Sequence, residues 1–94
     1  MAEFVLNGVV LDLPPDLVTR QIDRAIRAGT YENTEALALM RHVRGRARLL
    51  DLGAGAGYLA TLPGRIVAPG AVTAVEAAPE LARIARATLA RNGG

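Results

Sequence analysis

The sequence predicts a small α/β protein that is built around a parallel sheet. Residues 47–52 and 72–76 are short apolar runs, and each is followed by a segment with helical periodicity. A strand–helix–strand–helix order is typical of parallel strands joined by right-handed crossovers. The run 47–52 also lacks polar alternation, as expected of a strand buried on both faces. A glycine-rich segment, residues 53–57, joins this strand to its helix.

A β-hairpin is expected at the start of the chain. Asn7-Gly8 separates two β-prone runs, residues 3–6 and 9–13. Asn-Gly is a strong hairpin signal because both residues tolerate a positive φ. We therefore place a two-stranded antiparallel hairpin ahead of the parallel unit.

Two helices are expected between the hairpin and the first parallel strand. The first is predicted to begin at Pro14, because a proline without an N–H costs nothing there, and to end at Gly29. The second should begin at a cap formed by Asn33 or Thr34 and run to about Arg44. The apolar residues at helical spacing predict the inner faces, which are Val18, Ile22 and Ile26 in the first helix and Leu37, Met40 and Val43 in the second.

The helices of the parallel unit should differ in length. The helix that begins at Tyr58 contains Pro63-Gly64, so we expect it to be short or broken. Pro69-Gly70 predicts a turn before the second strand, and Pro79 predicts the start of the last helix. The residues expected to face inward from this last helix are Leu81, Ile84, Ala85, Thr88 and Leu89.

Composition and charge exclude several classes of protein. A chain of 94 residues forms one domain at most, and the absence of cysteine excludes disulfides, thiolate chemistry and cysteine-type metal sites. The net charge is only +2, and the arginines fall mostly on polar helix faces without interleaved aromatics, which does not favour nucleic acid as a partner. Neither a signal peptide nor a membrane-spanning run is visible, so we expect a cytoplasmic protein.

The glycine-rich turn carries the chemistry. It follows Asp51-Leu52, and its glycines let the backbone turn sharply and let a ligand approach the main chain. Glu76 ends the second strand, 19 positions after Gly57. A ribose-binding βαβ unit places at this spacing a carboxylate that accepts hydrogen bonds from both sugar hydroxyls. The sequence thus predicts the first half of a doubly wound, Rossmann-like sheet with a nucleotide-type cofactor at its carboxyl end.

These motifs resemble those of class I S-adenosylmethionine-dependent methyltransferases. Asp51-Leu-Gly-Ala-Gly-Ala-Gly is similar to the first motif of that class, and Val75-Glu76 followed by Pro79-Glu80 is similar to the second. Other segments resemble the FkbM family of methyltransferases, namely Asn7-Gly8, Leu13-Pro14, Gly29-Thr30-Tyr31-Glu32, Glu35 and Leu89-Ala-Arg-Asn92-Gly93. The resemblance implies S-adenosyl-L-methionine as the cofactor and O-methyl transfer to a small-molecule or sugar hydroxyl.

The resemblance also implies which residues bind the cofactor. The glycine turn would pass under its methionine and ribose parts, Asp51 would lie near the methionine amine, and Glu76 would hold the ribose hydroxyls. Ala77 would lie near the adenine edge, and Glu32 is a further candidate for the methionine end. No side chain is assigned as catalytic or as a metal ligand, because the lone His42 is expected to be an exposed helix residue. The turn residues in this set are Gly53, Ala54, Gly55 and Gly57.

The resemblance divides the chain into a lead-in, residues 1–46, and the first half of a cofactor domain, residues 47–94. In that class of enzyme a third strand would follow, so we expect the isolated chain to lack the acceptor site and to be inactive. Strand 47–52 would keep one edge without a partner unless the hairpin folds back onto it. Because an unpaired edge is a template for association, we expect self-association there.

Two alternative functions stay open at this point. Gly55-x-Gly57-x-x-Ala60 satisfies the dinucleotide pattern, which would make the chain the NAD(P)-binding half of an oxidoreductase. Asp51 argues against this, because dinucleotide-binding folds usually place a small or apolar residue there. The other alternative is a non-catalytic, truncated remnant of an enzyme.

Overall fold

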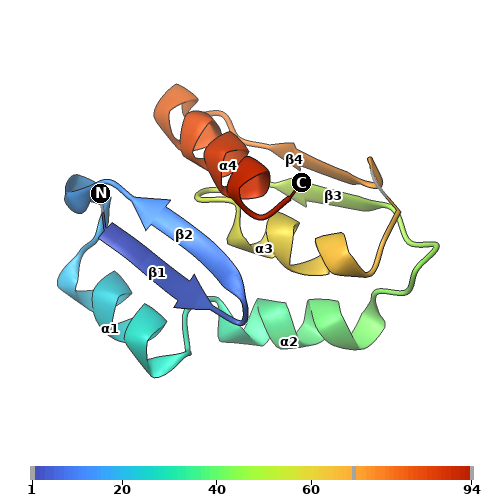
Figure 1. Ribbon diagram of the computed structural model, residues 1–94, viewed down its shortest axis with the longest axis horizontal. Coiled ribbons are helices and arrows are strands. Elements are labelled where there is room, and N and C mark those ends of the chain that lie inside the picture. Colours follow the sequence, from blue (N-terminus) through green and yellow to red (C-terminus); the bar gives the residue numbers. More distant parts are fainter. Residues whose placement is uncertain (1, 69, 94) are drawn as a thin grey trace.

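The computed structural model describes residues 2–68 and 70–93 and confirms the α/β class (Figure 1). It contains two separate two-stranded sheets. Strands β1 (Ala2–Leu6) and β2 (Val9–Leu13) form an antiparallel hairpin, and strands β3 (Leu49–Leu52) and β4 (Val72–Val75) pair in parallel. The hairpin does not pair with β3.

The hairpin forms as the Asn-Gly signal predicts. Asn7 and Gly8 have φ values of 50° and 78°, which is the backbone conformation that a tight two-residue turn requires. Alternate side chains of the hairpin face the interior and are buried, and Leu11 is fully inaccessible to solvent. The buried hairpin residues join one hydrophobic cluster with Tyr58, Leu62 and Ile84, so residues from both predicted parts of the chain share a core.

The prediction of one continuous helix from Pro14 is wrong. Residues Pro15–Leu17 form a separate 3₁₀ turn, η1, and helix α1 (Arg20–Ala28) begins after Thr19. The Thr19 hydroxyl accepts a hydrogen bond from the Ile22 N–H at 3.1 Å, which makes Thr19 the N-cap. Gly29 ends the helix in the left-handed conformation, as predicted.

Helix α2 (Asn33–His42) begins where expected, but neither Asn33 nor Thr34 caps it. Glu32 occupies the N-cap position with a φ of 48°, and its side chain makes no cap hydrogen bond. The helix also ends two residues before Arg44, because Val43 has an extended backbone conformation with a ψ of 134°.

The predicted inner face of α2 is mostly wrong. Leu37 and Met40 are 58% and 40% exposed, whereas Val43 is buried as expected. Ala36 is buried and Leu39 packs against the core instead. Positions 36, 39 and 43 form one stripe at helical spacing, so packing has turned the helix away from the stripe that its largest side chains suggested.

The parallel unit follows the predicted order with shorter strands. The helix after the glycine turn is indeed broken, into α3 (Tyr58–Thr61) and the 3₁₀ turn η2 (Leu62–Arg65), and α4 (Pro79–Arg91) begins at the predicted proline. Pro69 of the predicted turn lies outside the described residues. The expectation that β3 is buried on both faces is wrong, since Leu50 and Leu52 are 62% and 72% exposed.

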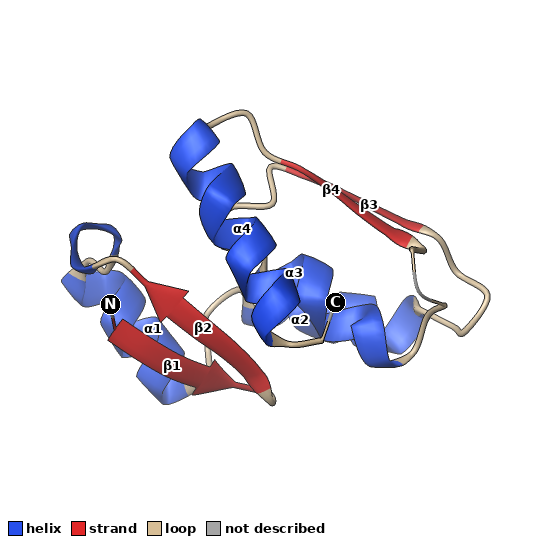
Figure 2. Cartoon of the chain, turned by 45° about the horizontal axis from the view of Figure 1, so that its top comes forward, coloured by secondary structure: helices blue, strands red, loops and turns tan. Residues whose placement is uncertain are grey.

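Helix α4 lies between the hairpin and the parallel sheet, and α3 packs beside it (Figures 1 and 2). The two helices lie on the same face of the parallel sheet, and the hairpin packs against their other side (Figure 2). In the described part of the chain, no helix is both long and apolar enough to cross a membrane.

Candidate cofactor site

The carboxyl ends of β3 and β4 lie side by side, because Leu52 pairs with Val75 in the parallel register. The chain leaving β3 is held to the end of β4 by two hydrogen bonds. The N–H groups of Gly53 and Ala54 both donate to the Val75 carbonyl, at 2.8 and 3.1 Å. The parallel pairing therefore brings the glycine turn next to Glu76.

Backbone conformation requires glycine at all three glycine positions of the turn, and close packing requires it at Gly57 as well. All have positive φ values, 73° at Gly53, 54° at Gly55 and 86° at Gly57, which other residues rarely adopt. A Cβ at Gly53 or Gly55 would meet no atom within 4 Å, so this side of the turn is open to a ligand. A Cβ at Gly57 would lie 3.0 Å from the Ala85 Cα, so glycine is also needed there for α4 to pack.

The Glu76 carboxylate lies against the glycine turn. Its Oε1 accepts from the Gly55 N–H at 2.8 Å, and its Oε2 accepts from the Ala78 N–H at 3.0 Å. The hydrogen bonds from Ala78 and Gly55 lower the pKa of Glu76, which keeps the group ionised at neutral pH. A carboxylate with one bond on each oxygen still has lone pairs for further donors such as hydroxyls.

Asp51 is the unsatisfied group of the site. The residue is partly buried, and its Oδ2 is buried without a hydrogen-bond partner among the described residues. Desolvation and then the charge of Glu76 raise the pKa of Asp51. A cationic ligand group would relieve both effects, because it pairs the orphaned oxygen and offsets the repulsion. The methionine ammonium of the expected cofactor fits this requirement.

The remaining predicted residues lie around the same end of the sheet. Ala77 is exposed immediately after Glu76. Glu32 is exposed at the start of α2, and partial desolvation and the charges of Glu35 and Asp51 raise its pKa. The structure thus groups the predicted cofactor residues, and their contacts with a cofactor stay predictions. His42 is exposed at the other end of α2.

Tyr58 lies next to the glycine turn and was not among the residues predicted for the site. Tyr58 follows the last glycine of the turn, is 1% exposed, and accepts a hydrogen bond from the Asn7 side chain at 2.8 Å. The Tyr58 ring also packs against Tyr31. No sequence signal connects positions 7 and 58, because the contact exists only in the folded chain.

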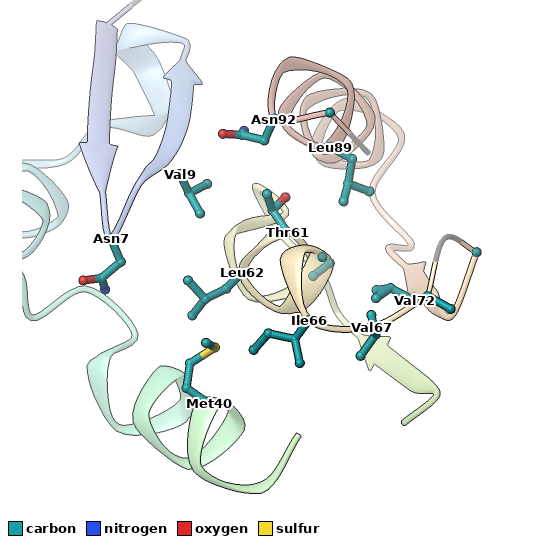
Figure 3. Close-up of a pocket in the computed structure, with 15 residues that line it drawn as sticks. Asn7, Val9, Met40, Thr61, Leu62, Ile66, Val67, Val72, Leu89 and Asn92 are labelled. Carbon is teal, nitrogen blue, oxygen red and sulfur yellow. The ribbon is translucent and has the colours of Figure 1, made fainter. Parts of the chain in front are cut away.

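A separate cavity of about 420 Å³ lies beside α3 and η2 (Figure 3). The tip of the hairpin, Met40 of α2, Leu62 and the last residues of α4 contribute to its lining. None of Asp51, the turn glycines or Glu76 lines it. The candidate cofactor site is therefore the open surface at the carboxyl ends of the strands, and not this cavity.

A turn of positive-φ glycines between carboxylates at the ends of two parallel strands agrees with the resemblance to class I S-adenosylmethionine-dependent methyltransferases, and the comparisons with known proteins support that class. The family model of protein-L-isoaspartate(D-aspartate) O-methyltransferase matches residues 21–94. The chain belongs to this family. A protein-L-isoaspartate O-methyltransferase of Aeropyrum pernix is 49% identical to it over 47 residues, which cover 49% of this chain and 18% of that relative. No solved structure was found to match.

These comparisons confirm the class of methyltransferase and S-adenosyl-L-methionine as the family's cofactor. They do not support the closer resemblance to the FkbM family, because the matching model describes isoaspartate methyltransferases. The match begins at residue 21, so the whole hairpin and η1 lie outside it.

Proposed function

We propose that this chain binds S-adenosyl-L-methionine at the carboxyl ends of β3 and β4 and provides the donor site of a protein-L-isoaspartate O-methyltransferase. The observation that carries the proposal is the arrangement of two carboxylates on the glycine turn. Glu76 is ionised and anchored on Gly55, and Asp51 beside it has an unpaired buried oxygen.

The residues of the site would act by positioning. The cofactor supplies a methyl group on a sulfonium centre, which an acceptor oxygen takes in an in-line displacement. Asp51 would pair with the ammonium group, and Glu76 would accept from the two ribose hydroxyls. The open side of Gly53 and Gly55 lets the main chain lie directly under the ligand. When the donor is held in this way, much of the translational and rotational entropy is already lost on binding, so the barrier of the transfer step is lower.

The family name favours the carboxylate of an isoaspartyl residue in a protein as the acceptor. A carboxylate is already ionised at neutral pH and needs no base, whereas a sugar or small-molecule hydroxyl needs one. The hydroxyl acceptor implied by the FkbM resemblance is therefore the less favoured alternative. Since the matched stretch is 18% of the relative's length, we propose donor binding for this chain and no turnover by the chain alone.

Calorimetric titration of the 94-residue chain with S-adenosylmethionine, S-adenosylhomocysteine and NAD tests the proposal. We expect both S-adenosyl ligands to bind and NAD to bind more weakly. Saturation at 100 times Kd should stabilise the chain by about 2.7 kcal/mol, which a melting curve detects. Tighter binding of NAD would favour the oxidoreductase alternative, and no binding of any ligand would favour a remnant.

A matched pair of variants locates the binding site. Glu76→Ala should weaken S-adenosylhomocysteine binding at least about tenfold, because hydrogen bonds to a charged group are lost. Glu80→Ala removes an exposed carboxylate four residues later and should leave the affinity unchanged. Equal affinities of both variants would place the ribose elsewhere.

A further inference from the structure

The N-terminal hairpin is fastened to the parallel unit at several points along its length. At its open end, Arg91 of α4 forms ion pairs with Glu3 at 3.2 Å and with Asp12 at 3.6 Å. Near its middle, the side chain of Asn92 accepts from the Val10 N–H at 2.8 Å and donates to the Val10 carbonyl at 2.9 Å. These contacts come from the last turn of α4 and its C-cap.

The contact at the hairpin tip is of a different kind, because it reaches the glycine turn. Asn7 is the first residue of the hairpin turn, and its Nδ2 donates to the Tyr58 hydroxyl at 2.8 Å. Figure 3 shows Asn7 at the tip, beside α2 and α3. Tyr58 begins α3 and directly follows Gly57. The hairpin tip is thus one hydrogen bond and one peptide bond away from the last glycine of the candidate site.

Tyr58 is held from a second side as well. Its ring packs against Tyr31, with 5.8 Å between the ring centroids and 53° between the planes. Burial, and then the nearby charge of Glu32, raise the pKa of Tyr31 to about 12. Tyr58 itself is only 1% exposed. The position of Tyr58 is therefore fixed by segments that precede the glycine turn in sequence.

The main chain transmits this position to the turn. The Gly57 carbonyl accepts from the Thr61 N–H at 3.0 Å and from the Thr61 hydroxyl at 2.7 Å. The Gly57 N–H donates back to the Ala54 carbonyl at 2.9 Å. Since Gly57 lies so close to Ala85 that a Cβ would not fit, a shift of Tyr58 has little room to be absorbed there.

We propose that Asn7 and Tyr58 are positioning residues of the glycine turn, so that the hairpin belongs to the donor site without touching the donor. Their hydrogen bond holds the turn in its binding conformation before the ligand arrives, which lowers the ordering cost of binding. The effect on affinity rests on the proposed donor binding. The effect on the turn itself does not.

Amide hydrogen exchange of the ligand-free chain, followed by NMR, tests the effect on the turn. Tyr58→Phe keeps the packed ring and removes the hydroxyl. We expect the amides of Ala54, Gly55 and Gly57 to exchange about fivefold faster, the factor that corresponds to one net hydrogen bond. The matched control is Arg91→Gln, which removes the ion pairs at the other end of the hairpin and should leave these rates unchanged.

Affinity for S-adenosylhomocysteine is the second measurement. Tyr58→Phe and Asn7→Gly should each weaken binding about fivefold, and the double variant no further, because both remove the same bond. Glycine is chosen at position 7 because it tolerates the φ of 50°. Asn7→Gly also serves if Tyr58→Phe does not fold.

The outcomes separate this inference from the proposed function. A wild-type chain that binds no S-adenosyl ligand overturns donor binding, and the exchange rates of the turn still decide whether Asn7 and Tyr58 position it. Unchanged exchange rates in both Tyr58→Phe and Asn7→Gly overturn the positioning role. An equal acceleration in Arg91→Gln also overturns it, because the effect would then be general loss of stability.

Discussion

Both sheets of this chain have two strands, but the hairpin packs into the core and the parallel sheet leaves one face exposed. The hairpin buries every second side chain, and its two acidic residues, Glu3 and Asp12, are both paired with Arg91. The parallel sheet exposes Leu50 and Leu52, and the carboxylate beside them has an unpaired oxygen. The hairpin therefore packs into the core, and the parallel sheet carries the candidate cofactor site on a partly exposed surface.

The separation has a physical basis. A hairpin forms locally and covers one face with its own alternating pattern, whereas parallel strands need helices or further strands on both faces. Here α3 packs against one face of the parallel sheet, and among the described residues Leu50, Leu52 and Val75 stay exposed on the other. Substitutions in the two sheets should accordingly have unequal effects.

The largest expected effect is on the free energy of unfolding. Leu11→Ala removes a fully buried hairpin side chain and should cost about 3 kcal/mol, a large share of the stability of so small a domain. Leu52→Ala, in the exposed face of β3, should change it by less than about 0.5 kcal/mol. Urea unfolding followed by circular dichroism compares the two, and equal losses would break the distinction between the sheets.

The next effect concerns self-association, which we propose occurs through the parallel sheet. Leu52→Ser should weaken association about tenfold, because burial of one leucine contributes about 1.5 kcal/mol or more. Val5→Ser is the matched control, since Val5 is 63% exposed on the outer face of the hairpin. Sedimentation equilibrium measures both. A monomeric wild-type chain, or a larger effect of Val5→Ser, would contradict the proposal.

The smallest expected effect concerns Asp51, whose carboxylate has an unpaired oxygen, in contrast to the paired carboxylates of Glu3 and Asp12. Asp51→Asn should raise the free energy of unfolding of the ligand-free chain at pH 7 by about 1 kcal/mol, because a partly buried charge with an unsatisfied oxygen is removed. The same variant should bind S-adenosylmethionine more weakly. Denaturation with and without ligand measures the two opposite changes.

The pH dependence of this difference follows from the raised pKa of Asp51. Below the ordinary aspartate range the carboxyl is protonated in the folded and unfolded chains, and the wild type should equal Asp51→Asn. As the pH rises through the folded-state pKa, the unfolded chain has already lost its proton, so the wild type loses stability relative to the variant. A gap that widens toward low pH would contradict the assignment.

Local signals in the sequence predicted the parts of the fold that depend on local geometry. The hairpin turn at Asn7-Gly8, the helix end at Gly29 and the break at Pro63 each follow from the backbone preference of one or two residues. The start of α1 was missed because Pro14 and Thr19 are both good starts, and the non-helical backbone at Val18 and Thr19 separates the turn η1 from α1. The rotation of α2 depends on packing, which its own periodicity does not contain.

The candidate site was predicted to a similar degree. The glycine turn and the spacing to Glu76 are visible in the sequence because the βαβ unit fixes both. The hydrogen bond from Gly55 to Glu76 and the contact between Asn7 and Tyr58 join residues 21 and 51 positions apart, so no local pattern encodes them. The exposure of one face of β3 was not predicted. An apolar run of residues in the sequence does not show whether another layer of the structure covers the strand.

Helix α4 contacts the glycine turn at one position and the hairpin at another, so the number of residues between the two contacts is fixed. Ala85 contacts Gly57, and Asn92 bonds the backbone of Val10, seven residues or about two turns further on. One residue inserted between them would turn Asn92 by about 100° around the helix axis and withdraw it from the hairpin. Insertions and deletions should therefore be tolerated in the loop between α2 and β3 and not within this stretch of α4.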